Sequence, residues 1–262
     1  MQRIEFAGLP GVGKTSVRRE LVRSLQALSG ANRYLTAEEA VLCVARKHID
    51  KIYRYLLLAL PNRIALKLST YLFGRSLLRF GSQNTFLANW GEGLESFLAS
   101  GQYSDLSVAD RENVIAGFLE TGSVFEVISR EFVRDEIVFF EEGFVQKSFM
   151  FLSHGDKFSS FPVDNVSRYL DSVPLPDVLV HVTSDIDTCY NRMISRPDGL
   201  TSRLSRCDEN EIRQFLSRAE RHLSKVTELL AKDKSVEIIN VDNSMDFSST
   251  VSDLYRRIIY QI

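Results

Sequence analysis

The stretch Gly8-Leu9-Pro10-Gly11-Val12-Gly13-Lys14-Thr15 sets the expectation for the fold of this 262-residue chain. It fits the pattern G-x-x-x-x-G-K-[ST], which is typical of a phosphate-binding loop. Residues 3–7 before it alternate as a buried strand does, and apolar residues after it recur at helical spacing from Val17 to Leu28. A strand, a glycine-rich turn and a helix in this order predict a site for the phosphates of a nucleoside triphosphate.

Each residue type in this stretch has a physical reason. The glycines allow backbone dihedrals that a β-carbon forbids, so successive N–H groups can point at phosphate oxygens. The following helix adds its positive amino-terminal end. Lys14 would reach the β- and γ-phosphates, and the hydroxyl of Thr15 would bind Mg²⁺. The predicted nucleotide-binding residues are Gly8, Gly11, Val12, Gly13, Lys14, Thr15 and Ser16.

Composition limits the classes of protein and partner. The formal net charge is −2, so no overall basic field favours nucleic acid. The three cysteines (Cys43, Cys189 and Cys207) form no C-x-x-C pair, which argues against a disulfide framework or a zinc site. A first strand close to Met1 leaves no room for a signal peptide, and no apolar run approaches the roughly eighteen residues of a membrane span. We therefore expect a cytoplasmic protein with no transmembrane segment.

Carboxylates follow two of the predicted strands. Glu38 and Glu39 come after a short strand at 33–36, on the edge where open α/β sheets bind ligands, so Glu38 is a candidate general base. The alternative is that both are solvated residues in the first turn of a helix. Glu141 directly follows the strand 137–140 and is the first choice for orienting Mg²⁺, with Glu142 second.

The segment 51–79 carries six basic residues and no acidic one. Arg63, Lys67, Arg75 and Arg79 are separated by multiples of four and form a basic ridge on the predicted helices. The ridge could be an ordinary solvated face, could gather an acidic acceptor, or could rest on an anionic membrane surface. These three explanations stay open.

A second group of arginines lies near residue 200. Arg192 and Arg196 are four apart on one face of a helix that follows a buried strand at 177–182. The loop after Pro197 carries Arg203 and Arg206, which could shield a transferred phosphoryl group and neutralise its charge. The alternative is a solvent-exposed basic loop.

The remaining elements follow from apolar patterning. Helices are predicted at 40–132 with interruptions, 144–152, 163–173, 208–230 and from 247 onward, and a last strand at 236–241. His181 lies inside a predicted strand and is expected to be a core histidine. Asp110-Arg111 is expected to be a surface pair on a helix.

Three segments resemble the P-loop kinase family of nucleotide and nucleoside kinases, nearest the thymidylate kinase and deoxynucleoside kinase branch. They are GLPGVGKT at 8–15, IVFFEEG at 137–143 and PDVLVHVTSDIDTCYNRMISR at 176–196. The resemblance implies a three-layer α/β fold with five parallel strands, in one domain over 1–262 with a helical insertion at about 40–132 and a lid at about 195–207. This sequence differs from the family pattern after the third strand, where it contains neither Asp-Arg-[Tyr/His] nor Glu-Arg-Ser.

The resemblance also implies an ATP-dependent phosphotransferase with ATP and Mg²⁺. Arg192 would lie near the adenine and Asn240 to Asp246 would border it. The implied catalytic residues are Lys14, Glu38, Glu141, Arg196 and Arg203, and the implied metal ligands are Thr15 and Glu141.

Two other classes of nucleotide-binding protein are alternatives to a kinase. A regulatory GTPase would need a guanine-reading Asn-Lys-x-Asp, and none follows a strand. A P-loop ATPase or regulatory nucleotide-binding protein without an acceptor is the alternative, but an arginine lid that excludes water favours transfer over hydrolysis. The acceptor could be a nucleoside, a nucleotide, a saccharide, an antibiotic or a lipid-linked glycan, and a homodimer stays open.

Overall fold

The structure is a computed structural model of the whole chain. It describes residues 1–29, 34–48, 77–100, 103, 106–132, 136–152, 163–197, 200, 204–205, 207–233, 236–244 and 246–259. Most of the basic ridge at 51–79 lies outside the described residues, as do Arg203 and Arg206 of the predicted lid.

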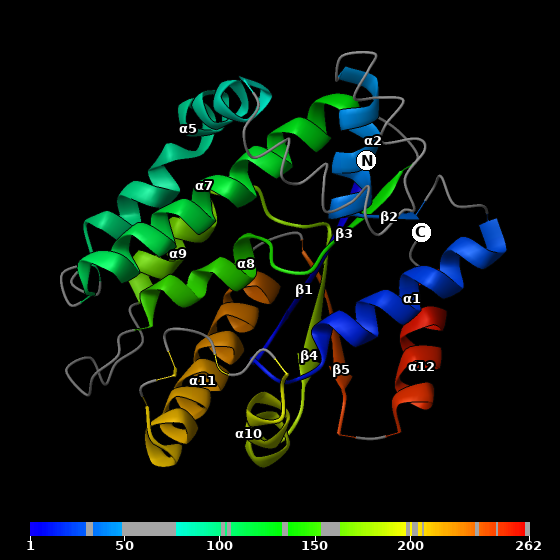
Figure 1. Cartoon of the computed structure of the whole chain (residues 1–262), viewed down its shortest axis with the longest axis vertical. Helices are drawn as coiled ribbons and strands as arrows, with labels where there is room; N and C mark the ends of the chain where they lie inside the picture. The colour runs from blue at the N-terminus through cyan, green and yellow to red at the C-terminus, as the bar shows by residue number, and fades with distance from the viewer. Residues whose placement is uncertain are drawn as a thin grey trace.

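A five-stranded, all-parallel sheet forms the centre of the molecule, in the order β2-β3-β1-β4-β5 (Figure 1). The strands are β1 (Gln2–Gly8), β2 (Tyr34–Thr36), β3 (Ile137–Phe140), β4 (Val178–Thr183) and β5 (Glu237–Asp242). β3 consists of apolar residues, and β4 is apolar except for His181 and Thr183, because helices cover both faces of these strands. The predicted sheet is therefore confirmed.

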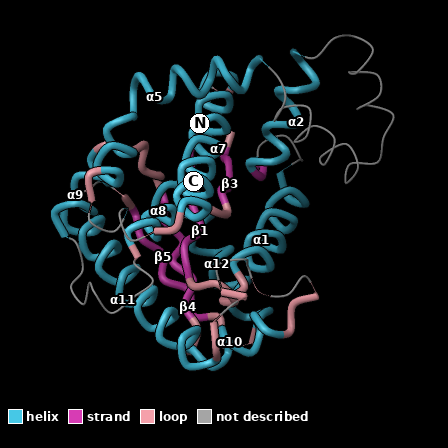
Figure 2. Tube along the Cα trace, turned by 60° about the vertical axis from the view of Figure 1, so that its left-hand side comes forward, coloured by secondary structure: helices cyan, strands magenta, loops and turns pink. Residues whose placement is uncertain are grey.

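Helices lie on both faces of the sheet, as Figure 1 and the turned view of Figure 2 show. On one face, α1 (Lys14–Ser29) packs against α12 (Phe247–Ile259). The helices of the other face include α7, on which α5 packs from outside. The remaining bounds are α2 (Ala37–His48), α5 (Leu77–Leu98), α7 (Val108–Glu131), α8 (Phe144–Lys147), the 3-10 helix η1 (Ser148–Phe151), α9 (Val163–Asp171), α10 (Ile186–Ile194) and α11 (Glu209–Asp233).

The alternation of side chains along the strands builds two cores. Ile4 and Phe6 of β1 belong to the core under α1 and α12, whereas Ala7 belongs to the core of aromatic residues on the opposite face. Glu5 points to that opposite face too, where its carboxylate accepts a hydrogen bond from the backbone amide of Gln146 in α8. The face of the sheet that α8 covers therefore contains the buried acid Glu5.

Parallel pairing brings the carboxyl ends of the strands to one edge. The residues that follow β1, β2 and β3 there are the phosphate loop, Glu38 and Glu141. Ligands of open α/β sheets bind at this edge. The fold thus gathers the predicted groups in one region.

One predicted helix differs from the structure. The helix predicted over 144–152 winds as an α-helix only to Lys147 and continues as the 3-10 helix η1. Contacts at both ends accompany this change: Glu5 holds the amide of Gln146, and the Ser148 hydroxyl lies 3.0 Å from Nε2 of His222 in α11. Of the helices that the structure describes, none has the length and apolar character to cross a bilayer.

Candidate active site

The phosphate loop has the backbone that its glycines predict. Gly11 and Gly13 have φ of 83° and 95°, a region that favours glycine. A β-carbon on Gly13 would lie 2.5 Å from Nδ2 of Asn243, and one on Gly11 would overlap the carbonyl of Cys189. No other residue type would fit these two positions without displacing their neighbours.

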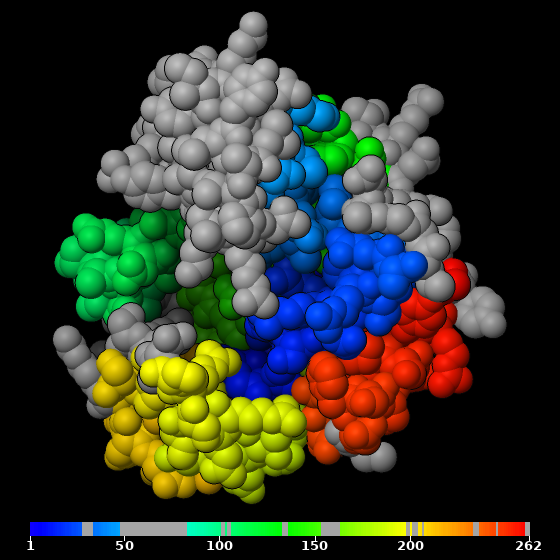
Figure 3. Space-filling model, turned by 45° about the vertical axis from the view of Figure 1, so that its right-hand side comes forward, coloured from blue at the N-terminus to red at the C-terminus, as the bar shows by residue number. Residues whose placement is uncertain are grey.

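Side chains that are distant in the sequence form hydrogen bonds with the backbone of the phosphate loop. Asn243 donates to the carbonyl of Val12 at 2.7 Å, and Arg192 of α10 donates to the same carbonyl at 3.3 Å. Arg192 also donates to the carbonyl of Asn243. Figure 3 shows the beginning of the chain (blue) beside the segment that contains α10 (yellow). The predicted adenine-side residues therefore lie against the phosphate loop.

Lys14 is buried and points back across its own loop. Its Nζ donates to the carbonyls of Gly8 at 2.8 Å and Leu9 at 3.2 Å. Burial lowers the pKa of Lys14, although the nearby carboxylates Glu142 and Glu141 oppose the shift. An incoming phosphate would exchange neutral carbonyl partners for charged oxygens, which form stronger hydrogen bonds with an ammonium group.

A polar cluster joins three elements beside the loop. Glu141 accepts a hydrogen bond from the Thr15 hydroxyl with one oxygen and from Arg18 Nη2 at 2.9 Å with the other. Nη1 of Arg18 donates to Glu38 at 2.9 Å. We call Arg18 and its two carboxylates the Arg18 bridge. Burial raises the pKa of Glu38, but the charge and hydrogen bonds of Arg18, with hydrogen bonds from Thr36 and the backbone, together outweigh burial, so this pKa lies below its usual value.

The neighbouring predicted residues have structural partners. Glu39 accepts from the backbone amide of Thr36 at 2.8 Å, and the Thr36 hydroxyl accepts from the amide of Glu39 in return. This reciprocal pair fixes the start of α2. His181 is buried and lies 3.2 Å from Oδ1 of Asn240 in β5, as expected of a core histidine.

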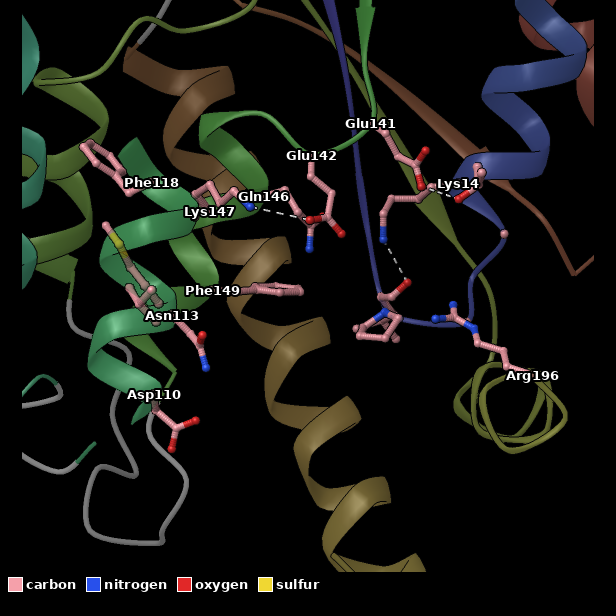
Figure 4. Close-up of a pocket in the computed structure, with 18 of the residues that line it drawn as sticks. Lys14, Asp110, Asn113, Phe118, Glu141, Glu142, Gln146, Lys147, Phe149 and Arg196 are labelled. Atoms are coloured by element: carbon pink, nitrogen blue, oxygen red, sulfur yellow. Dashed lines mark hydrogen bonds and ion pairs between the residues drawn. The ribbon is translucent and has the colours of Figure 1, made fainter. Parts of the chain in front are cut away.

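A cavity of about 860 Å³ extends from the phosphate loop to α7. Figure 4 shows Lys14, Glu141 and Arg196 at one end, Asp110 and Asn113 at the other, and Phe149 between them. The loop end is lined by Leu9, Pro10, Gly11, Gly13, Lys14, Thr15, Ser16, Arg192 and Arg196. Glu141 and Glu142 line the cavity as well, whereas Glu38 is not among its lining residues.

We call the α7 end the distal compartment. It combines apolar walls with a few polar groups, which is typical of small-molecule sites. At this end of the cavity, Lys147 Nζ forms an ion pair with Glu142 Oε2 at 3.6 Å. The distal compartment is lined by Leu106, Asp110, Asn113, Val114, Gly117, Phe118, Gln146, Lys147, Phe149 and Met150.

Sequence reasoning missed three parts of this site. Arg18 follows Lys14 by four residues and so lies on the same face of α1, a spacing that could have identified it. Asp110 was expected at the surface, but it lines the cavity, and only Arg111 packs away from it, over the ring of Tyr103. Gln146 lies on a helix of four residues, too short for any periodic signal.

The comparisons with known proteins concern the fold. The sequence matches no protein-family model and no curated protein. The structure is similar to deoxyadenosine kinase from M. mycoides, with a TM-score of 0.52 at 10% identity over 100% of both chains. It is also similar to thymidylate kinase from Candida albicans, with a TM-score of 0.51 at 13% identity over 99% of this chain and 92% of that one. The chain therefore has the P-loop kinase fold.

Proposed function

We propose that the protein is an ATP-dependent phosphotransferase that moves the γ-phosphate to a hydroxyl or phosphate group of a small acceptor, nucleoside-like, nucleotide-like or saccharide. One observation carries this proposal: the cavity continues from the phosphate loop into a second compartment lined by α7, α8 and η1, where an acceptor would bind. An ATPase that only hydrolyses nucleotide has no need of that compartment. The fold of the structural neighbours agrees with this proposal.

The residues at the loop end fit a magnesium–triphosphate complex. The glycine backbone offers N–H donors, and the buried Lys14 supplies a positive charge. The described residues contain no cluster of three or more His, Cys, Asp or Glu side chains suited to a metal, so Thr15 and Glu141 would share the ion with phosphate oxygens, as is usual for Mg²⁺. Mg²⁺ bound there would neutralise charge on the β- and γ-phosphates.

For a hydroxyl acceptor, the transfer step forms one bond and breaks one. The acceptor oxygen in the distal compartment bonds to the γ-phosphorus, and the bond from that phosphorus to the oxygen bridging the β-phosphate breaks, so ADP leaves with the electron pair. The hydroxyl proton passes to a carboxylate. Glu142 lines the cavity, whereas Glu38 stands behind Arg18 and would need that side chain to move. Lys14 and Arg196 stabilise the charge that develops between the two compartments.

The experiment is transfer from γ-labelled ATP to pooled nucleosides, nucleoside monophosphates and monosaccharides, with mass analysis of the labelled product. We expect little ATP consumption until the pool is added. Lys14→Ala should lower turnover roughly 10²–10³-fold, because one preorganised charge-stabilising donor is lost.

The matched control is Lys225→Ala on α11, where the exposed ammonium pairs with Glu228. It should transfer at the parent rate. Hydrolysis that is as fast without acceptors as with them, and no labelled product, would show that the protein is an ATPase instead.

A further inference from the structure

Gln146 joins the phosphate loop to the distal compartment. It is 7% exposed, and its Oε1 accepts a hydrogen bond from the backbone N–H of Gly8 at 2.9 Å. The carbonyl of Gly8 in turn accepts from Lys14 Nζ at 2.8 Å. Both polar groups of the first loop residue are thus held, one by α8 and one by the lysine of the loop.

The backbone that carries Gln146 is fixed from behind. Oε1 of the buried Glu5 accepts from the Gln146 amide at 2.8 Å. A β-carbon on Gly143, at the start of α8, would overlap the Glu5 carboxylate. α8 therefore sits directly on β1, and the Gln146 side chain starts from a constrained position.

The hydrogen bond to Gly8 also orients the other half of the amide. An N–H donor needs an oxygen opposite it, so the oxygen of Gln146 must face Gly8. The planar amide then turns its NH₂ group away from the loop, and Figure 4 shows Gln146 beside Glu142 and Lys147, above the ring of Phe149. Because Gln146 lines the cavity, this NH₂ group can donate to an oxygen atom in the distal compartment.

We infer that Gln146 is a positioning residue that aligns the acceptor with the phosphate loop, its oxygen fixing Gly8 and its NH₂ group donating to an acceptor oxygen. The part of this inference that concerns the acceptor, which we call the acceptor half, rests on the proposed function. The part that concerns the contact with Gly8 does not. Two substitutions separate them, because glutamate keeps an oxygen for Gly8 and loses the donor, whereas methionine loses both.

The experiment compares Gln146→Glu, Gln146→Met and the control Gln214→Met, which lies at the exposed surface of α11. Calorimetry measures affinity for the magnesium complex of a non-hydrolysable ATP analogue. We expect Gln146→Met to weaken it about tenfold, because a buried N–H loses its partner. Gln146→Glu should remain within about threefold of the parent, since Gly8 keeps an acceptor.

The second measurement follows γ-labelled phosphate into the acceptor pool and into water. Gln146→Glu should lower kcat/KM for the acceptor at least about tenfold and move the partition of phosphate toward water, since a bound acceptor loses its donor. A merely structural role would lower both products together and leave the partition unchanged.

The outcomes separate the inference from the function. If Gln146→Met binds nucleotide as tightly as Gln214→Met, the inference is overturned, whether or not an acceptor has been found. Equal losses of affinity in Gln146→Met and Gln146→Glu would also overturn it. A parent that binds the analogue but labels no acceptor removes the proposed function and the acceptor half together, and leaves the contact with Gly8 to be decided by calorimetry.

Discussion

Arg18 places one guanidinium between the carboxylates of Glu38, in the first turn of α2, and Glu141, directly after β3. Its side chain is 8% exposed, and it lies 2.9 Å from both Glu38 and Glu141. The chain continues from β3 as Glu141-Glu142-Gly143, so no arginine directly follows this acid in the sequence. The structure shows that α1 supplies one from the turn after Lys14.

We expect Arg18→Met to lower the free energy of unfolding by about 2 kcal/mol, measured by urea denaturation at neutral pH. Removing one partner of a buried pair costs more, but Glu38 and Glu141 are partly exposed and water compensates for part of the loss. The Arg18→Lys variant should have a free energy of unfolding between those of the parent and Arg18→Met, because an ammonium group keeps the charge but cannot donate to both carboxylates with the planar geometry of a guanidinium.

Arg19→Met is the control, since Arg19 is the neighbouring residue and is exposed. It should change stability by less than about 0.5 kcal/mol. Equal stability of the Arg18→Met and Arg19→Met variants would mean that the Arg18 bridge contributes nothing to the fold.

At the level of elements, α7 uses two glycines for different purposes. A β-carbon on Gly122 would overlap the ring of Phe86, so this glycine permits close packing of α5. A β-carbon on Gly117 would meet only Lys147 Nζ at 3.7 Å, and Gly117 lines the distal compartment. The first glycine serves packing and the second leaves space for a ligand.

Gly117→Leu should fill part of the distal compartment without disturbing the fold. We expect kcat/KM for the acceptor to fall at least about tenfold, while affinity for nucleotide stays at the parent value, because the loop end is not touched. Stability should stay the same or rise by up to about 1 kcal/mol, because leucine favours a helix more than glycine does.

Gly91→Leu in α5 is the control, because a β-carbon added at Gly91 would meet no other part of the protein within 4 Å. It should leave the transfer rate unchanged. Full activity of the Gly117→Leu variant with its acceptor would show that this end of the cavity does not bind the acceptor.

The sequence predicts elements better than it predicts the far end of the site. The loop at 8–15 and the apolar runs of β3 and β4 are local signals, and the structure confirms them. The distal compartment depends on how α7, α8 and η1 pack, which no short stretch encodes. Asp110 shows the difference: its helical setting was predicted correctly, but the side of the helix that faces the cavity was not.

The buried side chains of Glu5 and His222 have pKa values that are shifted in opposite directions. Burial raises the pKa of Glu5 from 4.5 to about 7, against the hydrogen bonds from α8 and the charges of Arg3 and Lys147. Burial lowers the pKa of His222 from 6.5 to about 4, against the hydrogen bond with Ser148. The folded protein therefore keeps a proton on Glu5 where the unfolded chain loses it, and rejects one at His222 where the unfolded chain binds it.

Between pH 4.5 and 7 the folded state binds more protons at Glu5 than the unfolded chain does, so this group lowers stability as pH rises. Between pH 4 and 6.5 the unfolded state binds more protons at His222, so that group raises stability as pH rises. Each effect amounts to about 3 kcal/mol over its window, and in the parent they nearly cancel.

Single substitutions should expose each effect in urea unfolding across these pH ranges. Relative to the parent, Glu5→Gln should gain about 3 kcal/mol as pH rises through the Glu5 window, because it no longer has to ionise a buried acid. His222→Gln should lose about as much relative to the parent as pH rises through the His222 window, because it lacks the group whose protonation favours unfolding at low pH. Subtracting the parent removes the titrations that all three proteins share. If both differences are independent of pH, neither group is held in the protonation state that its burial implies.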